Sequence, residues 1–385
     1  MVIPARPLDG FLVADLTRVL AGPTATMMLA DLGARVIKVE RPGLGDDTRR
    51  FGPPWAGSSS SYFESANRSK QSIALDFSDE TDAALARELT DRADIVVENY
   101  RTGALARFGL DEASVRARNP SVIYASITGF GSGDGAGELG YDFLLQAVGG
   151  LMSVTGQPDG EPTKVGVAMI DLLAAKDAVM GILAAVIHRA RTGEGQHVEV
   201  NLMSSAVASL ANQASAYLAT GEVPQRMGNR HPSIAPYETV RCSDGYLALA
   251  VGNDRQWAAL AALIGEPELA DDPQFSTNSA RVENHAAMLA RLEAGLASAG
   301  VATWTERMRG VGIPAGKVND IGEALALAER LGLSPRIGVD AGHPDQIRHP
   351  VRYSAFEPTT PTAPPALDQH GAELREWLAA PPKPA

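Results

Sequence analysis

Three glycines, Gly135, Gly137 and Gly140, match the spacing G-x-G-x-x-G of a dinucleotide-binding motif. In such motifs the pattern follows a strand directly, and its first glycine closes a tight turn into a helix. Here the glycines lie inside GFGSGDGAGELG (129–140), a flexible stretch between a predicted strand and the next helix. The sequence therefore predicts a surface or lid loop at this position, in preference to an NAD site.

Other common catalytic patterns are missing from the sequence. It has no Walker A lysine, HExxH, GxSxG or cluster of His and Cys, so P-loop, zinc and common serine hydrolase chemistry lose their usual supports. The single cysteine, Cys242, allows neither an intrachain disulfide nor a CxxC pair, and is most simply interpreted as an apolar filler. Of the kinds of catalysis considered, chemistry at a carboxylate side chain remains as the candidate.

Asp171 is a carboxylate in a position where such chemistry is possible. It begins an Ala-, Leu- and Met-rich stretch that runs to Arg191 and is typical of a buried helix. A carboxyl group with the ordinary pKa of about 4 is ionised at neutral pH and needs no general base to act as a nucleophile. At a helix N-terminus, free backbone N–H groups and the helix dipole would favour its charged form. A simple N-cap is the alternative interpretation.

Apolar, β-rich runs alternate with helical stretches in the first part of the chain. The runs are FLVADL (11–16), RVIKVE (35–40), SIALDF (72–77), IVVENY (95–100), VIYASIT (122–128) and HVEVNL (197–202). Segments between them, such as 79–91, have helical composition. This alternation is typical of βαβ units with a mostly parallel sheet covered on both faces. We predict an α/β fold, a Rossmann-like large domain with a smaller α+β domain.

The later part of the chain differs from the first part in composition and in its predicted elements. A Gly-, Pro- and polar-rich stretch, GEVPQRMGNRHPS (221–233), follows a predicted helix at 203–220, and GYLALAVG (245–252) predicts a strand before helices at 254–264 and 280–298. Proline keeps the segment 348–370 extended. We expect a large domain at 1–205, a linker helix and loop at 206–234, a small domain at 235–325, and a C-terminal segment at 326–385 that returns to the large domain.

Composition and charge limit the possible partners. The 385 residues are 45% hydrophobic and 21% charged, as in ordinary globular proteins, and the net charge is −12. This charge argues against nucleic acid and anionic membranes as partners. No apolar run approaches the ~20 residues of a membrane span, and MVIPARPLDG lacks the apolar core of a signal peptide. We expect a cytoplasmic protein.

Several stretches resemble the class III CoA-transferases (CaiB/BaiF type), a family that includes formyl-CoA transferase, carnitine CoA-transferases and α-methylacyl-CoA racemase. The resemblance runs through nearly the whole chain in the family's order. The matching stretches are PLDGFLVADLTRVLAGPTATMMLADLGARVIKVERPGLGDDTR, SKQSIALDF, DIVVENYRTGALARFGL, GYDFLLQAVGGLMSVTG, PTKVGVAMIDLLA, RTGEGQHVEV, GNRHPSIAPY, DPQFSTNSARVEN and VGIPAGKVND.

The resemblance implies a covalent role for Asp171, which ends the element GVAMID (166–171). In the family this aspartate attacks an acyl-CoA thioester to give a mixed anhydride, and CoA then returns to form an aspartyl-CoA thioester. Coenzyme A or acyl-CoA is thus implied as substrate, and no metal is implied. Lys38, Arg49 and Arg101 are left open as ligands of the phosphate-bearing end of CoA. The implied CoA contacts are Leu20, Ala21, Arg41, Leu75, Asp76, Phe77, Ser78, Asn99, Tyr100, Arg101, Arg107 and Tyr141.

The same resemblance separates two reactions. The racemase branch pairs its aspartate with a histidine in Gly-His-Asp, because racemisation needs an acid/base group on each face of the substrate carbon. This chain has Gly140-Tyr141-Asp142, and tyrosine with a pKa of about 10 is a poor base. Transfer is therefore favoured over racemisation, with Tyr141 contacting substrate or CoA. A non-catalytic acyl-CoA-binding protein is a further alternative.

Residues 227–233 differ from the consecutive glycines of formyl-CoA transferase and resemble succinyl-CoA-dependent dicarboxylate transferases, as in succinyl-CoA:glutarate CoA-transferase. A second substrate carboxylate needs a cationic or multi-donor partner, which Arg230, His231 and Ser233 beside Gly228 could provide. An ordinary polar linker is the alternative. The resemblance also implies an interlocked homodimer, in which the small domain of one subunit approaches the active site of the other.

Overall fold

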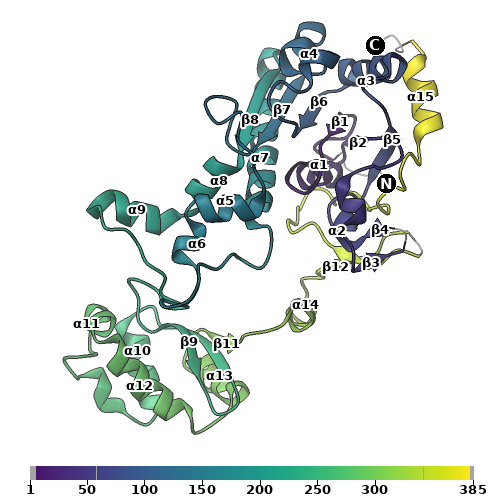
Figure 1. Ribbon diagram of the computed structural model, residues 1–385. Helices are drawn as coiled ribbons and strands as arrows, with labels where there is room; N and C mark the ends of the chain where they lie inside the picture. Colours follow the sequence, from purple (N-terminus) through teal and green to yellow (C-terminus); the bar gives the residue numbers. More distant parts are fainter. Residues whose placement is uncertain (1–5, 58, 341, 382–385) are drawn as a thin grey trace. The chain divides into compact units, whose positions relative to one another are not determined.

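The computed structural model describes residues 6–57, 59–340 and 342–381, which form two compact units (Figure 1). The first contains the described residues of Met1–Leu151, Val165–Ser215 and Ser334–Ala385. The second contains Met152–Lys164 and Ala216–Leu333. Each unit has a hydrophobic core of its own. The domain boundaries expected at 205, 234 and 325 stay a prediction.

A six-stranded sheet, parallel throughout, forms the centre of the first unit. Its order is β5-β2-β1-β6-β7-β8, which is the 3-2-1-4-5-6 order of doubly wound dinucleotide-binding folds. Each strand overlaps one of the predicted apolar runs, so the α/β class with a parallel sheet is confirmed. The strands are β1 (Leu12–Leu16), β2 (Arg35–Glu40), β5 (Lys70–Ala74), β6 (Ile95–Glu98), β7 (Ile123–Thr128) and β8 (Gln196–Asn201).

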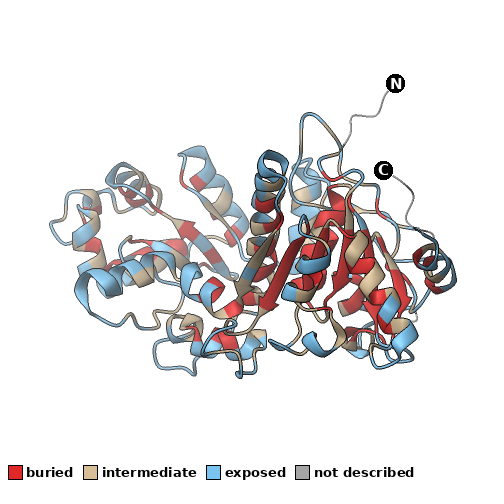
Figure 2. Cartoon of the chain, turned by 90° about the horizontal axis from the view of Figure 1, so that it is seen from above, coloured by how far each residue is buried: buried red, intermediate tan, exposed pale blue. Residues whose placement is uncertain are grey.

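Helices cover both faces of this sheet, because successive strand residues point to opposite sides. Val13 belongs to the core shared with α1 (Ala21–Asp31), α5 (Asp142–Val148), α7 (Met169–Thr192) and α8 (Leu202–Ser209). Its neighbour Ala14 belongs to the opposite core, shared with α3 (Glu80–Arg92), α4 (Glu112–Arg118) and α15 (Gly371–Ala379). Figure 2 shows buried residues concentrated on the strands and on the inner faces of these helices.

The long helix α7 is the element that carries Asp171. Its buried face includes Ala174, Ala178, Ile182 and Ala185, which recur at helical spacing and pack in the core that α1 shares. Small alanines allow close packing, as expected from the sequence. The helix begins at Met169, so Asp171 lies at its third residue and is not its N-cap.

Shorter elements complete the first unit and lead into the second. The helix predicted at 203–220 is divided after Ser209 into α8 and α9 (Ala211–Thr220), with Ala211 at φ +43°. The remaining elements up to this point and near the C-terminus are η1 (Asp47–Arg50), β3 (Trp55–Ala56), β4 (Ser59–Ser60), α2 (Ser61–Glu64), η2 (Ala106–Phe108), α6 (Leu151–Val154), β12 (Arg336–Ile337) and β13 (Gln346–Ile347).

The second unit contains a three-stranded antiparallel sheet in the order β11-β10-β9. Trp257 and Trp304 are fully buried in its core. The helix predicted at 280–298 is divided at Asn284. Its elements are β9 (Tyr237–Arg241), β10 (Tyr246–Ala250), α10 (Asp254–Leu263), η3 (Pro267–Ala270), α11 (Asn278–Glu283), α12 (His285–Leu296), α13 (Val301–Gly310), β11 (Ala315–Lys317) and α14 (Ile321–Arg330).

The C-terminal segment returns to the first unit. Between residues 348 and 370 it is irregular, and its backbone is hydrogen-bonded to the first unit: Thr359 N donates to Asp31 O and Ser69 N donates to Thr362 O. Helix α15 then packs against α3 and β5. Within the described part of the chain, none of the helices has the length and apolar character needed to cross a bilayer.

Candidate active site

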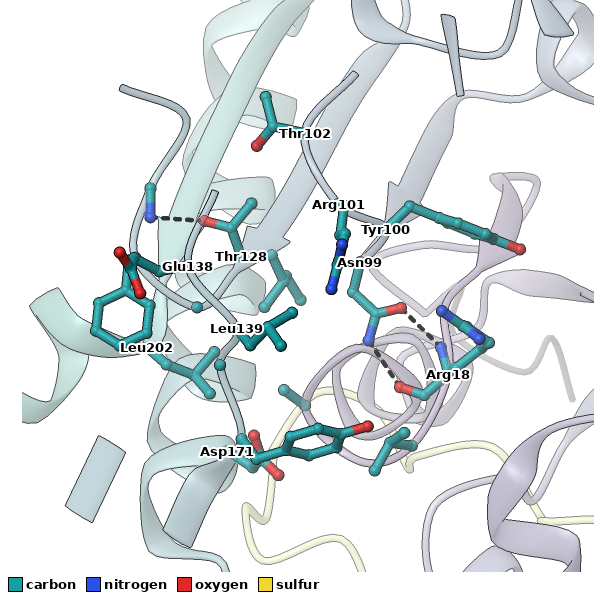
Figure 3. A pocket seen from close by; sticks show the side chains of 18 of the residues that line it. Arg18, Asn99, Tyr100, Arg101, Thr102, Thr128, Glu138, Leu139, Asp171 and Leu202 are labelled. Atoms are coloured by element: carbon teal, nitrogen blue, oxygen red, sulfur yellow. Dashed lines mark hydrogen bonds between the residues drawn. The ribbon is translucent and has the colours of Figure 1, made fainter. Parts of the chain in front are cut away.

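Asp171 lines a cavity of about 270 Å³ in the first unit (Figure 3). The N-terminus of α7, which carries Asp171, is capped by a residue of another helix. Ala168, the N-cap of α7, forms no side-chain cap, and Asp142 Oδ1 instead accepts hydrogen bonds from the backbone N–H groups of Ile170 (2.7 Å) and Asp171 (3.2 Å). A carboxylate from α5 thus satisfies N–H groups that every helix start leaves free.

Gln146, one turn after Asp142 on α5, adds further hydrogen bonds between α5 and the segment that precedes α7. Its buried side chain donates to Asp142 Oδ2 at 2.6 Å and to Val167 O at 3.2 Å, and its Oε1 accepts from Val165 N at 2.8 Å. The segment that leads into α7 is therefore fixed to α5 at several points. The backbone at Asp171 is positioned before any ligand arrives.

The environment of Asp171 disfavours its charge. Burial, with a further contribution from the negative charge of Asp142, raises the pKa of Asp171 to about 7. The expectation of an ordinary pKa, lowered further by the helix terminus, was wrong. The reason is that burial disfavours the charged form, while Asp142 takes the hydrogen bonds of the helix start and adds a like charge nearby.

Tyr62 lies in the electrostatic field of the same two carboxylates. Burial raises its pKa to about 12, and the charges of Asp171, Asp142 and Asp46 add to the shift. Its ring packs edge-on against Phe51, with 5.7 Å between ring centroids. The phenol therefore stays protonated at neutral pH and can act only as a neutral polar group. Neither Tyr62 nor Asp142 was singled out from the sequence.

The predicted CoA contacts line two cavities at the carboxyl ends of the strands. Six line the cavity of Asp171: Leu20, Ala21, Asn99, Tyr100, Arg101 and Tyr141. The other six line a second cavity of about 250 Å³: Arg41, Leu75, Asp76, Phe77, Ser78 and Arg107. Tyr100 lines both cavities. This is the edge at which open α/β sheets bind ligands.

Two of the three basic residues left open from the sequence, Lys38 and Arg49, have structural partners, whereas Arg101 lines the cavity of Asp171. The fully buried Lys38 Nζ donates to Thr17 O at 2.9 Å and pairs with Asp46 at 2.9 Å. Arg49 forms a two-pronged pair with Glu40, at 2.8 and 2.7 Å. Both residues hold together the loops around the second cavity, and their charges are already matched by carboxylates.

The glycine-rich stretch 129–140 forms a loop on one wall of the Asp171 cavity. Its ends approach closely: a Cβ on Gly140 would lie 2.5 Å from the Cα of Gly129, so neither position has room for a side chain. Ser132 ties the loop to β8 by donating from its backbone N (2.8 Å) and its hydroxyl (2.6 Å) to Glu199. The stretch is a closed loop beside the site.

The four predicted substrate contacts, Gly228, Arg230, His231 and Ser233, belong to the second unit. Gly228 has φ +65°, and its N donates to Gly156 O at 2.9 Å. His231 Nδ1 accepts from Ser233 N at 3.0 Å, and its ring packs on Tyr237. The exposed Arg230 side chain has no hydrogen bond or ion pair with any residue in the described ranges.

Metal ligands are not clustered in this protein's described residues: nowhere in them do three His, Cys, Asp or Glu side chains form a group that could hold an ion. The groups that converge on the candidate site are carboxylates, arginines, a phenol and backbone amides.

The fold and site define a doubly wound α/β protein with a ligand site at its strand ends and a carboxylate at a helix start. The model of CoA-transferase family III matches residues 8–371, so the chain belongs to that family and is an enzyme. Succinyl-CoA:glutarate CoA-transferase of Mus musculus is 42% identical, with 95% of this chain and 85% of that protein covered. Acetyl-CoA:oxalate CoA-transferase of Acetobacter aceti is 41% identical, with 98% and 97% covered.

A solved structure agrees with this assignment. The crystal structure of a CaiB/BaiF family protein from Brucella suis superposes with a TM-score of 0.88 at 44% identity, covering 97% of this chain and 100% of that one. The family predicted from the sequence motifs is confirmed.

Proposed function

We propose that this transferase moves CoA from succinyl-CoA to a second dicarboxylic acid, with Asp171 as the covalent nucleophile. The observation that carries the proposal is the position of Asp171 in a cavity that also contains half of the CoA contacts implied by the family. Relatives named for succinyl-CoA and glutarate support the choice of acids.

The proposed reaction exchanges acyl groups without consuming water. An Asp171 oxygen attacks the thioester carbonyl, the C–S bond breaks, and CoA thiolate leaves a mixed anhydride. The thiolate attacks the Asp171 carbonyl carbon, which releases succinate and leaves an aspartyl-CoA thioester. The acceptor carboxylate then attacks this carbon, the aspartyl C–S bond breaks, and CoA thiolate leaves a second anhydride. The thiolate then attacks the acceptor's acyl carbon, and the bond between that carbon and the Asp171 oxygen breaks. New acyl-CoA leaves, and Asp171 regains its carboxylate.

The raised pKa of Asp171 supports this role. A more basic carboxylate is a better nucleophile, and acylation removes the charge that burial and Asp142 disfavour. The strain on the ionised group is therefore relieved as the first bond forms. The same desolvation limits the access of water to both activated intermediates.

Intact mass spectrometry after incubation with succinyl-CoA tests the covalent step. We expect an adduct that hydroxylamine removes and that Asp171→Ala abolishes. Asp177→Asn is the matched control, because Asp177 lies on the same helix and accepts from Ser205 Oγ at 2.6 Å. An unmodified wild-type protein that also fails to exchange labelled acids would defeat the proposal for this donor. Uptake of deuterium at the substrate α-carbon would favour racemisation.

The specificity for dicarboxylic acids is assigned to the second unit. Arg230 is the proposed partner of the second carboxylate, with His231 and Ser233 as further polar groups beside the Gly228 turn. Arg230→Gln should raise KM for dicarboxylic acids and leave monocarboxylic acids unaffected. Arg255→Gln, at another exposed arginine of this unit, is the control. An equal loss on both classes of acid would contradict this assignment.

We further propose an interlocked homodimer and a cytoplasmic location, on the basis of the family resemblance and the composition. Light scattering that shows a monomer would contradict the dimer.

A further inference from the structure

Arg18 lies where the two cavities meet. It follows β1, and within the described residues it shares with Tyr100 alone the property of lining both cavities. Figure 3 shows it beside Asn99 and Tyr100 at the edge of the Asp171 cavity. The family motifs imply CoA contacts in both cavities but assign no role to Arg18.

Hydrogen bonds on both sides of the peptide unit fix the backbone around Arg18. Asn99 Oδ1 accepts from Arg18 N at 2.8 Å, and Asn99 Nδ2 donates to Arg18 O at 2.7 Å. The next residue, Val19, has φ +71°, and its N donates to Asp46 Oδ1 at 3.3 Å. A β-branched residue rarely adopts this conformation, and such strain persists where the surroundings impose it, often at functional sites. The loop therefore holds the backbone of Arg18 in a set position, from which the side chain extends.

The guanidinium of Arg18 contacts a ring and a carboxylate but has few hydrogen-bond acceptors. It lies over the ring of Tyr100, 5.0 Å from the centroid, and pairs with Asp47 at 3.7 Å, too far for a hydrogen bond. Its Nε is buried without an acceptor in the described structure. An arginine has five N–H donors, so most of this group's donors are available to a ligand.

The carboxylate of Asp47 lies at a position where arginines surround an anionic group. Its carboxylate is approached by Arg18 from the β1 loop, by Arg41 from the β2 loop at 3.2 Å, and by Arg50 at 3.7 Å. Arg18 and Arg41 line the cavities, whereas Arg50 lines neither. Two arginines from neighbouring strand ends thus converge on one anionic group, which is a geometry that suits phosphate oxygens.

We propose that Arg18 binds the diphosphate of CoA. This inference rests on the proposed function, which places the thioester sulfur near Asp171, and on Arg41 and Arg107 in the second cavity, for which the family resemblance implies contacts with the phosphate-bearing end of CoA. The diphosphate joins pantetheine to adenosine, so a CoA molecule that runs from one cavity to the other must place its diphosphate near their junction. Arg18 is the cationic side chain at that junction.

The test measures the dissociation constants of CoA, ADP and 3′-AMP by calorimetry with wild type, Arg18→Gln, Arg18→Lys and Arg50→Gln. ADP carries a diphosphate without pantetheine, and 3′-AMP carries only the 3′-phosphate. Loss of a charge-assisted hydrogen bond weakens binding by roughly 10- to 100-fold. We expect Arg18→Gln to show this loss for CoA and ADP alike, with 3′-AMP unchanged. Arg18→Lys should lose less, and Arg50→Gln should bind all three as wild type does.

Other results would overturn the inference. Arg18 would contact pantetheine or the acyl group if CoA binding weakened and ADP binding did not, and the 3′-phosphate if 3′-AMP binding weakened. An effect of Arg50→Gln as large as that of Arg18→Gln would indicate a general loss of positive charge. Tight CoA binding by both wild type and Arg18→Gln contradicts this inference alone, whereas no CoA binding by wild type contradicts the proposed function as well. Equal thermal unfolding of the variants shows that each is folded.

Discussion

Asp15 and Asp171 are aspartates of the same α/β unit, and burial raises the pKa of each, yet their neighbours differ. Asp15, in β1, is fully buried against Lys70 at 3.0 Å, with the hydroxyls of Thr17 and Thr26 at 2.5 and 2.7 Å. Lys70 and Lys38 outweigh burial and hold the pKa of Asp15 well below its usual range. Asp171 faces Asp142, and its pKa rises to about 7.

The difference shows that burial alone does not decide the state of a carboxylate. Opposite charges make Asp15 a permanently ionised part of the scaffold beneath the ligand loops. Burial and a like charge together make Asp171 a group that can gain or lose charge at neutral pH, as a carboxylate that alternates between free and acylated forms must. The same residue type thus serves structure in one place and chemistry in the other.

The largest effect that would test this comparison is the loss of stability in Asp15→Asn. The substitution leaves buried Lys70 and Lys38 without one of their carboxylates, and breaking a buried pair typically costs about 3–5 kcal/mol. Urea unfolding at pH 7 measures it. Lys70, whose pKa burial lowers to about 8 despite Asp15, should lose its proton more readily in the variant. An Asp15→Asn protein as stable as wild type would show that these charges are not coupled.

Asp171→Asn should change stability in the opposite direction. The folded pKa is raised above the unfolded one, so the native protein holds an extra proton between about pH 4 and pH 7, and the stability this contributes is lost as the pH rises through 7. The variant should therefore be more stable than wild type by about 2 kcal/mol at pH 8, since each pKa unit is worth about 1.4 kcal/mol and partial exposure reduces the full shift. Below about pH 4 the two should unfold nearly alike, and the difference should grow as the pH rises from about 4 to about 7. A variant that is less stable at pH 8 would refute the raised pKa.

Asp142→Asn should have the smallest effect of the three. The amide oxygen can still accept from Ile170 N and Asp171 N, but the like charge is gone, so the pKa of Asp171 should fall. The pH profile of kcat/KM should move by the same amount toward acid. An unchanged midpoint would mean that burial alone raises the pKa, and Asp142 would then be only a helix cap.

The sequence predicted the sheet well, because each strand is a short apolar run and short-range patterns determine such runs. It predicted the helix of Asp171 to within two residues. The divisions at Leu210 and Asn284 were not predicted, since neither position carries glycine or proline.

The sequence pointed to some residues of the candidate site and missed others. Asp171 and the implied CoA contacts each belong to a short local motif, and most of the contacts lie where strands end. Asp142 was missed although its neighbour Tyr141 was considered, because its hydrogen bonds reach residues 28 and 29 positions further along the chain. The wrong expectation for the pKa of Asp171 has the same origin. Arg18 likewise gains its neighbours Asn99 and Tyr100 from the loop after β6, and Tyr62 is affected by Asp142 of α5 and Asp171 of α7, all through tertiary contacts.

The pH dependence of Asp171 acylation tests the central claim most directly. Rapid-quench mass spectrometry with limiting succinyl-CoA would follow the adduct, and peptide mapping would locate it on Asp171. We predict a rate constant that rises with pH through a midpoint near 7 and is level above pH 8. A rate that is constant from pH 5 to pH 9, or an adduct on another residue, would contradict the account.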